Sequence, residues 1–407
     1  MENTRICLRL DKEALLLRVS CVSFMCLSEF NTLLTTLNIQ GLLKTFLILC
    51  ISYFPLFFIL IRKTNEIPWD ALSFIIIVIF LYNITILAHP EYYNTIRGVM
   101  WNNVVSLHTG VVFYLIFRTI RKEDDLKFIL LTSSLILFLF YFIQSLNAIK
   151  SGYWALSTST GIREIEYSMT FGYKMLLPCL TFFSYGIKEK KKMLLILGVI
   201  SGGEILMLGS RAATICIAVY FVLYIIFIRA AEMNTKKRIF YIISITVISL
   251  IILLYYKQIL LSVGNLFDSL GFSSRTINRI IQGNLIEDPI RLSIYGQSVD
   301  IIKEHWLFGH GILSDRYYFG VYCHNFFLEL FIQFGLIGGC IVLFFLFSKL
   351  LKGFNSKHYM AFKQGFIIFF SCSIVRLMVS YSFWEDSNFW SMLAILITLT
   401  NMEKRFS

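Results

Sequence analysis

Apolar stretches long enough to cross a membrane recur along nearly the whole chain of 407 residues. Crossing roughly 30 Å of bilayer hydrocarbon takes about 20 helical residues. Hydrophobic residues make up 57% of the sequence, charged residues 15%, and the mean hydropathy is +0.71. A soluble protein of this composition would expose more apolar surface than water tolerates. The sequence therefore predicts an all-α, polytopic helical membrane protein with a single transmembrane domain over residues 1–407.

About twelve such spans follow one another along the chain. The first is the weakest, because Arg18 and Glu29 interrupt it, and a signal peptide is its alternative interpretation. We keep it as a span, since no small-residue cleavage site precedes a soluble domain there. The expected spans cover about residues 14–35, 41–61, 71–88, 100–117, 128–146, 167–186, 193–209, 211–228, 239–256, 325–348, 364–380 and 387–402.

Lysine and arginine are distributed unevenly between the loops. If the N-terminus is cytoplasmic, most of the 37 Lys and Arg residues fall in cytoplasmic segments, and the short loops on the other side carry few. Positive charge gathers on the cytoplasmic side of membrane proteins. We therefore expect both termini in the cytoplasm and the loop 257–324 outside it. The same distribution accounts for the formal net charge of +12 without a nucleic-acid partner.

Metal sites and disulfide frameworks are not expected. The nine cysteines are scattered, mostly inside spans, and form no C-x-x-C pair. No D-x-D motif occurs in an outside loop, and the nearest acidic pair there is Glu164 and Glu166. The sequence therefore predicts neither a metal nor another cofactor.

The loop 257–324 contains an expected helix. Asp288 followed by Pro289 suits an N-cap and first helical position. Leu292, Tyr295, Val299, Ile302 and Trp306 then recur at steps of three and four residues. This spacing predicts an amphipathic helix at about 289–306 that lies on the membrane surface or caps the bundle.

Basic residues near the outer ends of the spans form a candidate binding set. An ionisable group inside a bilayer is costly, so each is a functional candidate. Guanidinium groups bind phosphate oxygens through two parallel hydrogen bonds, which suits a diphosphate on a lipid. The alternative is snorkelling of long side chains to the nearer surface. The set comprises Lys44, Lys174, Arg211, Arg291 and Arg376, with His324 at the same level.

His324 is the candidate base. Histidine accepts a proton near neutral pH, and His324 stands beside Asn325 at the outer end of an expected span. Gly335, Gly338 and Gly339 follow in that span, and small residues let helices approach closely. We therefore expect this span in the centre of the bundle. Glu204, in the outer half of another span, is expected to be either protonated or paired with a basic residue from another span.

Several short pieces of sequence resemble, in order and spacing, the O-antigen ligase/polymerase superfamily. They lie between about residues 200 and 348 and read Leu208-Gly209-Ser210-Arg211-Ala212-Ala213, Arg291-Leu292-Ser293-Ile294-Tyr295, Gly309-His310-Gly311, and His324-Asn325 followed by Gly335-Leu336-Ile337-Gly338.

The resemblance implies a glycosyltransferase at the outer leaflet of the bacterial plasma membrane. Its substrate would be an oligosaccharide on undecaprenyl diphosphate, and its product O-antigen or capsule. A chain-length regulator protein is a candidate partner. Arg211 and Arg291 would contact the diphosphate, and His324 would be the base in a metal-independent, inverting displacement. Lys174 and Arg376, from the basic set described above, are further candidates for binding the substrate.

Three alternatives stay open at this point. Within the same superfamily, a ligase would transfer the finished chain to lipid A-core. A lipid-linked oligosaccharide flippase would also have about twelve spans, although transporters usually show repeated halves and broken helices. The chain could also be a non-catalytic partner in polysaccharide assembly.

Overall fold

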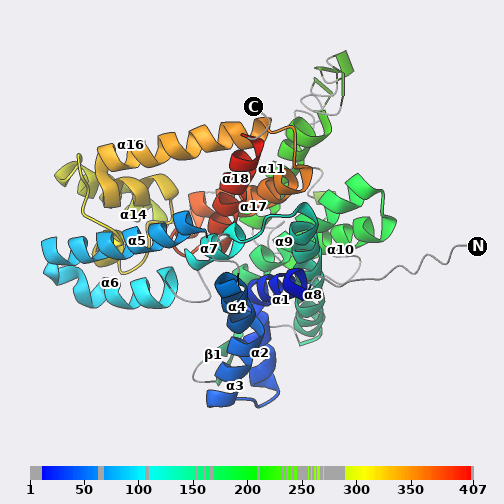
Figure 1. The fold of residues 1–407 in the computed structure, drawn as a ribbon, viewed down its shortest axis with the longest axis horizontal. Coiled ribbons are helices and arrows are strands. Elements are labelled where there is room, and N and C mark those ends of the chain that lie inside the picture. Colours follow the sequence, from blue (N-terminus) through cyan, green and yellow to red (C-terminus); the bar gives the residue numbers. More distant parts are fainter. Residues whose placement is uncertain are drawn as a thin grey trace, which may run out of the picture.

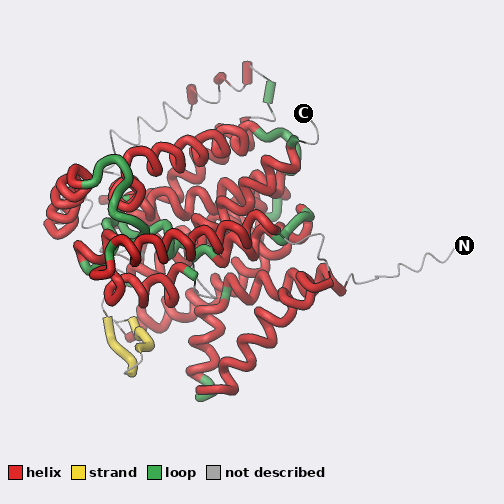
Figure 2. The backbone as a smooth tube through the Cα atoms, turned by 60° about the vertical axis from the view of Figure 1, so that its left-hand side comes forward, coloured by secondary structure: helices red, strands yellow, loops and turns green. Residues whose placement is uncertain are grey.

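The computed structural model describes residues 12–62, 68–105, 110–151, 154–158, 161–165, 168–208, 211–230 and 289–404, with isolated positions between 233 and 269. In these residues the chain is helical apart from one short hairpin (Figures 1 and 2). The longer helices of the first half are α1 (Lys12–Met25), α2 (Leu27–Thr36), α3 (Gly41–Ile48), α4 (Phe54–Arg62), α5 (Trp69–Ala88), α6 (Tyr93–Val99), α7 (Val112–Arg118), α8 (Glu123–Ser151), α9 (Met169–Glu189), α10 (Lys192–Leu208) and α11 (Arg211–Tyr224).

The later part of the chain is described from residue 289 onward as a series of helices. They are α14 (Pro289–Glu304), α15 (Ser314–Phe319), α16 (Phe326–Asn355), α17 (Met360–Val379) and α18 (Ser387–Glu403). Short 3-10 and π segments extend or join the helices of the first half: η1 (Leu49–Tyr53), η3 (Pro90–Tyr92), η4 (Met100–Val104) and η5 (Ile225–Arg229).

Six helical segments among the described residues are long and apolar enough to cross a membrane. They are Gly41–Phe58, Trp69–Ala88, Glu123–Ser151, Ala212–Arg229, Phe326–Asn355 and Met360–Val379. The predicted class, a helical membrane protein, agrees with this result. The remaining expected spans coincide with shorter or more polar helices, except that 239–256 lies largely outside the described residues.

The expected span 100–117 is wrong as a continuous helix. Segment η4 ends at Val104 and α7 begins at Val112. Between them Gly110 has a φ of +59°, and a β-carbon there would lie 2.6 Å from the carbonyl oxygen of Trp384. The chain breaks because its backbone packs directly on the segment before α18.

The one hairpin departs from the all-α prediction. Strands β1 (Trp154–Thr158) and β2 (Gly161–Ile165) pair antiparallel, with Trp154 opposite Ile165. Both lie in a loop that the predicted topology places outside the membrane. Tryptophan, threonine and isoleucine favour the extended backbone of strands, and a loop is free of the requirement for helix that the bilayer imposes.

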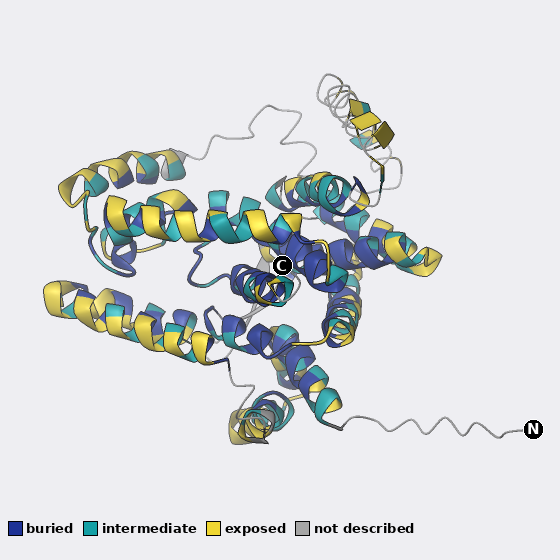
Figure 3. Ribbon diagram, turned by 45° about the horizontal axis from the view of Figure 1, so that its top comes forward, coloured by how far each residue is buried: buried dark blue, intermediate teal, exposed yellow. Residues whose placement is uncertain are grey.

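The centre of the bundle is formed by α17 and α18, and α16 lies at its edge (Figure 3). The apolar window of α17 is 67% buried, against 28% for α16. The expectation that the glycine-rich span would be central is therefore wrong. The glycines of α16 serve a different purpose, which the contacts of Gly335 reveal below.

Two ion pairs explain how the first expected span tolerates its charges. Arg18 Nε donates to Asp125 Oδ1 at 2.8 Å, and α1 packs against α8 there. Glu29 is 3% exposed, forms an ion pair with Lys174 at 2.9 Å and accepts a hydrogen bond from Tyr141 at 2.6 Å. Buried charges persist when paired and hydrogen-bonded, so α1 and the buried face of α2 can carry them where they pack against the bundle.

Contacts between loops join segments that the predicted topology places on one side. On the outer side, the Tyr92 hydroxyl lies 3.0 Å from that of Tyr318. On the cytoplasmic side, Glu403 Oε1 lies 2.9 Å from His358 Nδ1, and Glu123 accepts from the amide of Ala361. The fold is compatible with the predicted arrangement of loops.

Candidate functional site

Helix α16 is interrupted at Gly335, which has φ +60° and ψ −168°. Residues 306–311 lie against the interruption. The amides of His310 and Gly311 donate to the carbonyls of Ile332 and Gln333 at 2.8 and 3.0 Å. In return, the amides of Leu336 and Ile337 donate to the carbonyls of Trp306 and Leu307 at 2.7 and 3.1 Å. The loop thus satisfies the backbone groups that the broken helix leaves open, as an apolar environment requires.

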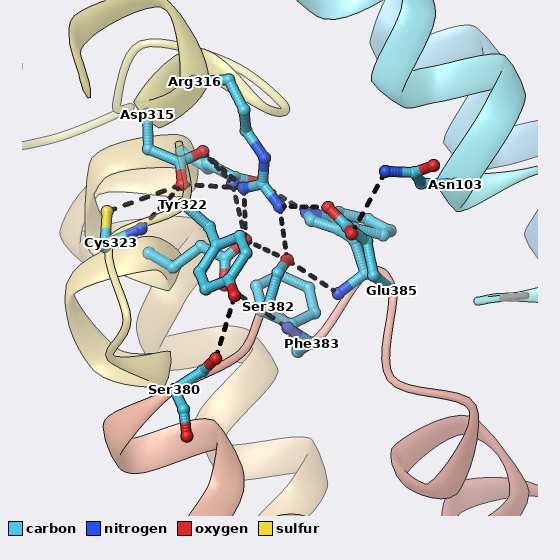
Figure 4. A network of polar contacts seen from close by, with 12 residues as sticks. Asn103, Asp315, Arg316, Tyr322, Cys323, Ser380, Ser382, Phe383 and Glu385 are labelled. Atoms are coloured by element: carbon cyan, nitrogen blue, oxygen red, sulfur yellow. Dashed lines mark hydrogen bonds and ion pairs between the residues drawn. The ribbon is translucent and has the colours of Figure 1, made fainter. Parts of the chain in front are cut away.

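The loop leads directly into α15, which carries a buried arginine. Arg316 is 3% exposed, and its Nη1 contacts Asp315 Oδ2 at 2.7 Å and Glu329 Oε1 at 2.5 Å. Its Nη2 donates to Ser382 Oγ at 2.5 Å and contacts Glu385 Oε1 at 3.1 Å. Figure 4 shows Arg316 between the α15 loop and the segment before α18. One guanidinium group therefore connects α15, α16 and the α17–α18 connection.

Further polar groups complete this network around Arg316. Gln333 Nε2 donates to Asp315 Oδ1 at 2.9 Å, and Gln333 Oε1 accepts from the indole of Trp384 at 2.7 Å. Asn103 Nδ2 donates to Glu385 Oε2 at 3.2 Å (Figure 4). Burial lowers the pKa of Arg316, but the carboxylates of Asp315 and Glu329 outweigh it and raise that pKa well above its ordinary value. Arg316 is a permanent cation that holds α15, α16 and the α17–α18 connection together.

Sequence reasoning missed Arg316. It stands next to Asp315 in a polar loop, where an adjacent pair of opposite charges is normally solvated. The signal that was present is the glutamate of α16: Glu329 lies only a few residues inside an apolar span and needs a cationic partner.

His324 lies between the Arg316 network and α14. It has a φ of +56°, and its carbonyl accepts a hydrogen bond from Tyr295 at 3.2 Å. The next residue, Asn325, caps α16 by accepting from the amides of Phe327 and Leu328 at 3.0 and 3.2 Å. The left-handed turn and the cap hold the imidazole at the outer mouth of α16.

Aromatic rings connect His324 with Arg376. The His324 ring lies 4.5 Å from that of Tyr322, whose ring lies 5.7 Å from that of Tyr381. The Arg376 guanidinium lies 3.8 Å above Tyr381 and 4.7 Å above Tyr173. Tyr322 also donates to the Ser380 carbonyl at 3.0 Å, so the tyrosine between the two candidates is held in place.

The pKa of the Tyr322 hydroxyl depends on the charged groups around it. Burial and then Glu385 raise its pKa, whereas Arg376, Arg316 and Arg291 oppose the rise. Three arginines from α14, α15 and α17 are therefore within electrostatic range of one tyrosine. The structure joins His324 and Arg376 through the rings of Tyr322 and Tyr381, whereas Arg291 acts on Tyr322 through its charge.

A cavity of about 430 Å³ opens beside Arg376. Lys174 and Tyr173 of α9 also line it, with Asp386, Asn388 and Ser391 from the start of α18. Two of the predicted binding residues, Lys174 and Arg376, thus share one cavity. We refer to it as the basic cavity.

Carboxylates partly neutralise the basic cavity. Lys174 Nζ lies 2.9 Å from Glu29 Oε1, and Arg376 Nη1 lies 3.7 Å from Asp386 Oδ1. Burial raises the pKa of Asp386, and Arg376 opposes that shift. The pair with Arg376 is long, so the guanidinium is held mainly by the two tyrosine rings and keeps donors for a ligand.

The other candidates are placed as follows. Arg291 stands in the first turn of α14, which occupies the range expected for a helix, whereas its expected cap Asp288 is outside the described residues. Arg211 is the first residue of α11, which packs against α17, and its side chain is outside the described residues. Lys44 donates to Thr35 at 3.3 Å and does not line the basic cavity. Glu204 accepts a hydrogen bond from Ser145 at 2.5 Å, and among the described side chains it forms no ion pair, which leaves the protonated carboxyl as the expected alternative.

Residues 196–343 match the model of the O-Antigen ligase family. This segment runs from α10 through the interruption of α16 and contains Arg211, Arg291, Arg316 and His324. The match confirms the resemblance to the O-antigen ligase/polymerase superfamily. Members of this family are membrane glycosyltransferase-like enzymes of surface polysaccharide synthesis.

No curated protein and no solved structure matches the chain. The similarity to the family therefore rests on the matched segment. The residues that line the basic cavity come mainly from α1, α2, α9, α17, α18 and the α17–α18 connection, and all of them lie outside that segment. The inclusion of the basic cavity in the candidate site therefore rests on its geometry alone.

Proposed function

We propose that the protein polymerises undecaprenyl-diphosphate-linked oligosaccharide repeat units at the outer leaflet of the bacterial plasma membrane. The proposal rests on one observation: His324 and Arg376 lie on either side of a pair of tyrosine rings. His324 contacts the ring of Tyr322, Arg376 contacts the ring of Tyr381, and the two rings contact each other. A proton acceptor and a phosphate-binding guanidinium lie on the two sides of this pair. Glycosyl transfer from a lipid diphosphate needs both groups.

The basic cavity is the proposed place of the donor diphosphate. Its volume of about 430 Å³ suits a diphosphate and part of a sugar. Arg376 and Lys174 supply positive charge, and the amide of Asn388 and the hydroxyl of Ser391 supply neutral partners. Arg291 approaches from α14 and Arg211 begins α11, so both complete the phosphate-binding set in this proposal.

The reaction is a single displacement. His324 takes the proton from the acceptor sugar hydroxyl, and the resulting oxygen attacks the anomeric carbon of the donor. The bond between that carbon and the diphosphate oxygen breaks as the new glycosidic bond forms. Arg376 and Arg291 stabilise the negative charge that builds on the leaving diphosphate. Attack opposite the leaving group inverts the anomeric carbon.

The break in α16 is the observation that favours a flippase, because transporters bind substrates at interrupted helices. In those proteins the freed backbone groups line a cavity. Here residues 306–311 occupy them through four backbone hydrogen bonds. The break therefore serves to attach a loop, and we retain the transferase.

The experiment is a genetic replacement. The protein, or its variant His324→Ala, is expressed at equal levels in cells of its source that lack the chromosomal copy, and surface polysaccharide is separated on a gel. We expect a ladder of repeat units with the wild type and single repeat units with the variant. A ladder with His324→Ala removes the histidine from the mechanism. If the lipid A-core of the variant strain carries single repeat units, the protein is a polymerase. If the variant strain instead accumulates long chains that are not attached to lipid A-core, the protein is a ligase.

A further inference from the structure

A second cavity, of about 410 Å³, lies between α16, α17 and α18. Every side chain that lines it is apolar except Ser373. The Ser373 hydroxyl donates to the carbonyl of Phe369 within its own helix at 2.9 Å, so it presents no donor to a ligand. We refer to this cavity as the apolar groove.

The apolar groove and the basic cavity occupy two faces of the same helix pair. On α17, Arg376 lines the basic cavity, whereas Leu377 and Met378 line the apolar groove. On α18, Asn388 lines the basic cavity and Phe389 the apolar groove. The C-terminal end of α17 therefore separates the basic cavity, which suits a charged head group, from the apolar groove, which suits a hydrocarbon chain.

One end of the apolar groove lies close to His324, the candidate base. Its uppermost residues on α16, Phe326 and Phe327, follow His324 and Asn325 directly. The Asn325 amide lies 3.5 Å from the carbonyl of Met378, which also lines the groove. From Met378 to Phe370 the groove follows α17 for about 12 Å, at 1.5 Å per residue.

The groove is open on the outside of the bundle. Phe344 is 77% and Phe347 62% exposed, and both line it. They belong to a helix long and apolar enough to cross a membrane, so this surface faces hydrocarbon. A lipid chain can enter from the bilayer without crossing a polar barrier.

We propose that the apolar groove holds the polyprenyl chain of the second lipid-linked substrate, the acceptor. The inference rests on the proposed polymerase, because joining two lipid-linked glycans requires two lipid anchors near one base. The basic cavity accounts for the donor head group. The groove accepts no charged group, has one end at Phe326, two residues from His324, and has phenylalanine rings that suit the stiff, methyl-branched prenyl chain. It therefore orients the acceptor with its sugars toward the imidazole.

Two adjacent phenylalanines give a matched test. Phe344 lines the groove, whereas Phe345 is 42% exposed and does not line it. Each is replaced in turn by benzoylphenylalanine, which on illumination bonds to nearby C–H groups. The purified protein is placed in phosphatidylethanolamine–phosphatidylglycerol vesicles that contain undecaprenyl phosphate as the probe. Mass spectrometry then identifies the attached lipid.

At position 344 we expect the share of polyprenyl adducts to exceed its share of the bilayer roughly tenfold. At position 345 the adducts should follow the bilayer composition. Three results would overturn the proposal. They are adducts that follow the bilayer composition at both positions, adducts of phospholipid alone, and a cross-link from position 344 to the protein itself.

A second variant measures the effect on catalysis. Ile374→Trp fills the groove, and Ile341→Trp adds the same bulk to the exposed surface of α16 outside it. We expect Ile374→Trp to raise the KM for the acceptor roughly tenfold with unchanged donor affinity, and Ile341→Trp to resemble the wild type. An unchanged acceptor KM in both would contradict the groove's role. If the wild type transfers no glycan, the proposed function fails, whatever lipid position 344 captures.

Discussion

A β-carbon on Gly335 would lie 2.5 Å from the amide nitrogen of Gly309, and one on Gly309 would lie 2.5 Å from the amide nitrogen of Gly335. Both glycines also have positive φ, +60° and +73°. The two backbones are in direct contact, and neither residue has room for a side chain. This contact anchors the loop that carries Arg316 and His324 to α16.

Gly335→Ala should therefore destabilise the protein. The overlap and the positive φ together cost at least about 2 kcal/mol, and the melting temperature in detergent should fall. Gly296→Ala in α14 is the control, because a β-carbon there meets nothing within 4 Å. That variant should melt at the wild-type temperature or above. Equal melting of Gly335→Ala and wild type would show that the loop is not attached as described.

Arg316→Gln should be more damaging than any substitution at an exposed arginine. It leaves the carboxylates of Asp315, Glu329 and Glu385 without their cation at a buried place, which costs about 3–5 kcal/mol. Arg316→Lys should rescue only part of the loss, because an ammonium lacks the planar fork. The control is Arg97→Gln, at an arginine that contacts the Tyr93 ring on the surface. Melting temperatures that are equal for Arg316→Gln and Arg97→Gln would contradict a role for Arg316 in stability.

The stability of the protein should fall as the pH drops below about 6.5. Burial lowers the pKa of His310, the carbonyl of Ile301 and Glu304 oppose the shift, and His305 and His89 add to it. The His310 Nε2–H donates to that carbonyl at 2.9 Å, and Nδ1 accepts from Tyr318 at 2.9 Å. Because the folded state binds the proton less tightly than the unfolded state, stability is retained above about pH 6.5 and lost as the pH falls toward the lowered pKa.

Melting curves measured at several pH values check this dependence. His310→Gln should flatten it above the range in which carboxylates titrate, whereas His305→Gln, at an exposed histidine, should retain it. An unchanged slope in His310→Gln would assign the effect to other groups.

Arg376→Lys should weaken donor binding although it keeps the charge. The guanidinium stacks on Tyr381 and Tyr173, and an ammonium reproduces neither the stacking nor the paired donors. We expect the affinity for undecaprenyl-diphosphate oligosaccharide to fall about tenfold or more. Arg97→Lys is the matched control away from the cavity. Wild-type affinity in Arg376→Lys would mean that the arginine serves packing only.

Hydropathy predicted most helices because the bilayer length constrains them strongly. It failed at 100–117, where Gly110 packs on the Trp384 carbonyl, and in α16, where three glycines indicated close helix packing. A glycine that permits a close helix contact and one that permits positive φ look the same in a sequence. Only the position of the partner, here Gly309, distinguishes them.

The candidate site was predicted in part. An ionisable residue in an apolar span must have a purpose, and this argument identified Lys174 and Arg376, which share the basic cavity. It could not predict their partners: Glu29 lies far from Lys174 in the sequence, and Asp386 meets Arg376 only through the fold of the α17–α18 connection. The sequence argument also missed Arg316, because two of its three carboxylate partners lie 13 and 69 residues further along the chain.

Glycosyl transfer by the purified protein tests the central claim most directly. Vesicles that contain undecaprenyl-diphosphate oligosaccharide are incubated with the wild type or with His324→Ala, and both the chain length of the lipid-linked glycan and the donor affinity are measured. We predict elongation by the wild type, a rate at least about 100-fold lower for His324→Ala, and equal donor affinity for both. No elongation by the wild type, or elongation by His324→Ala at the wild-type rate, would contradict the account.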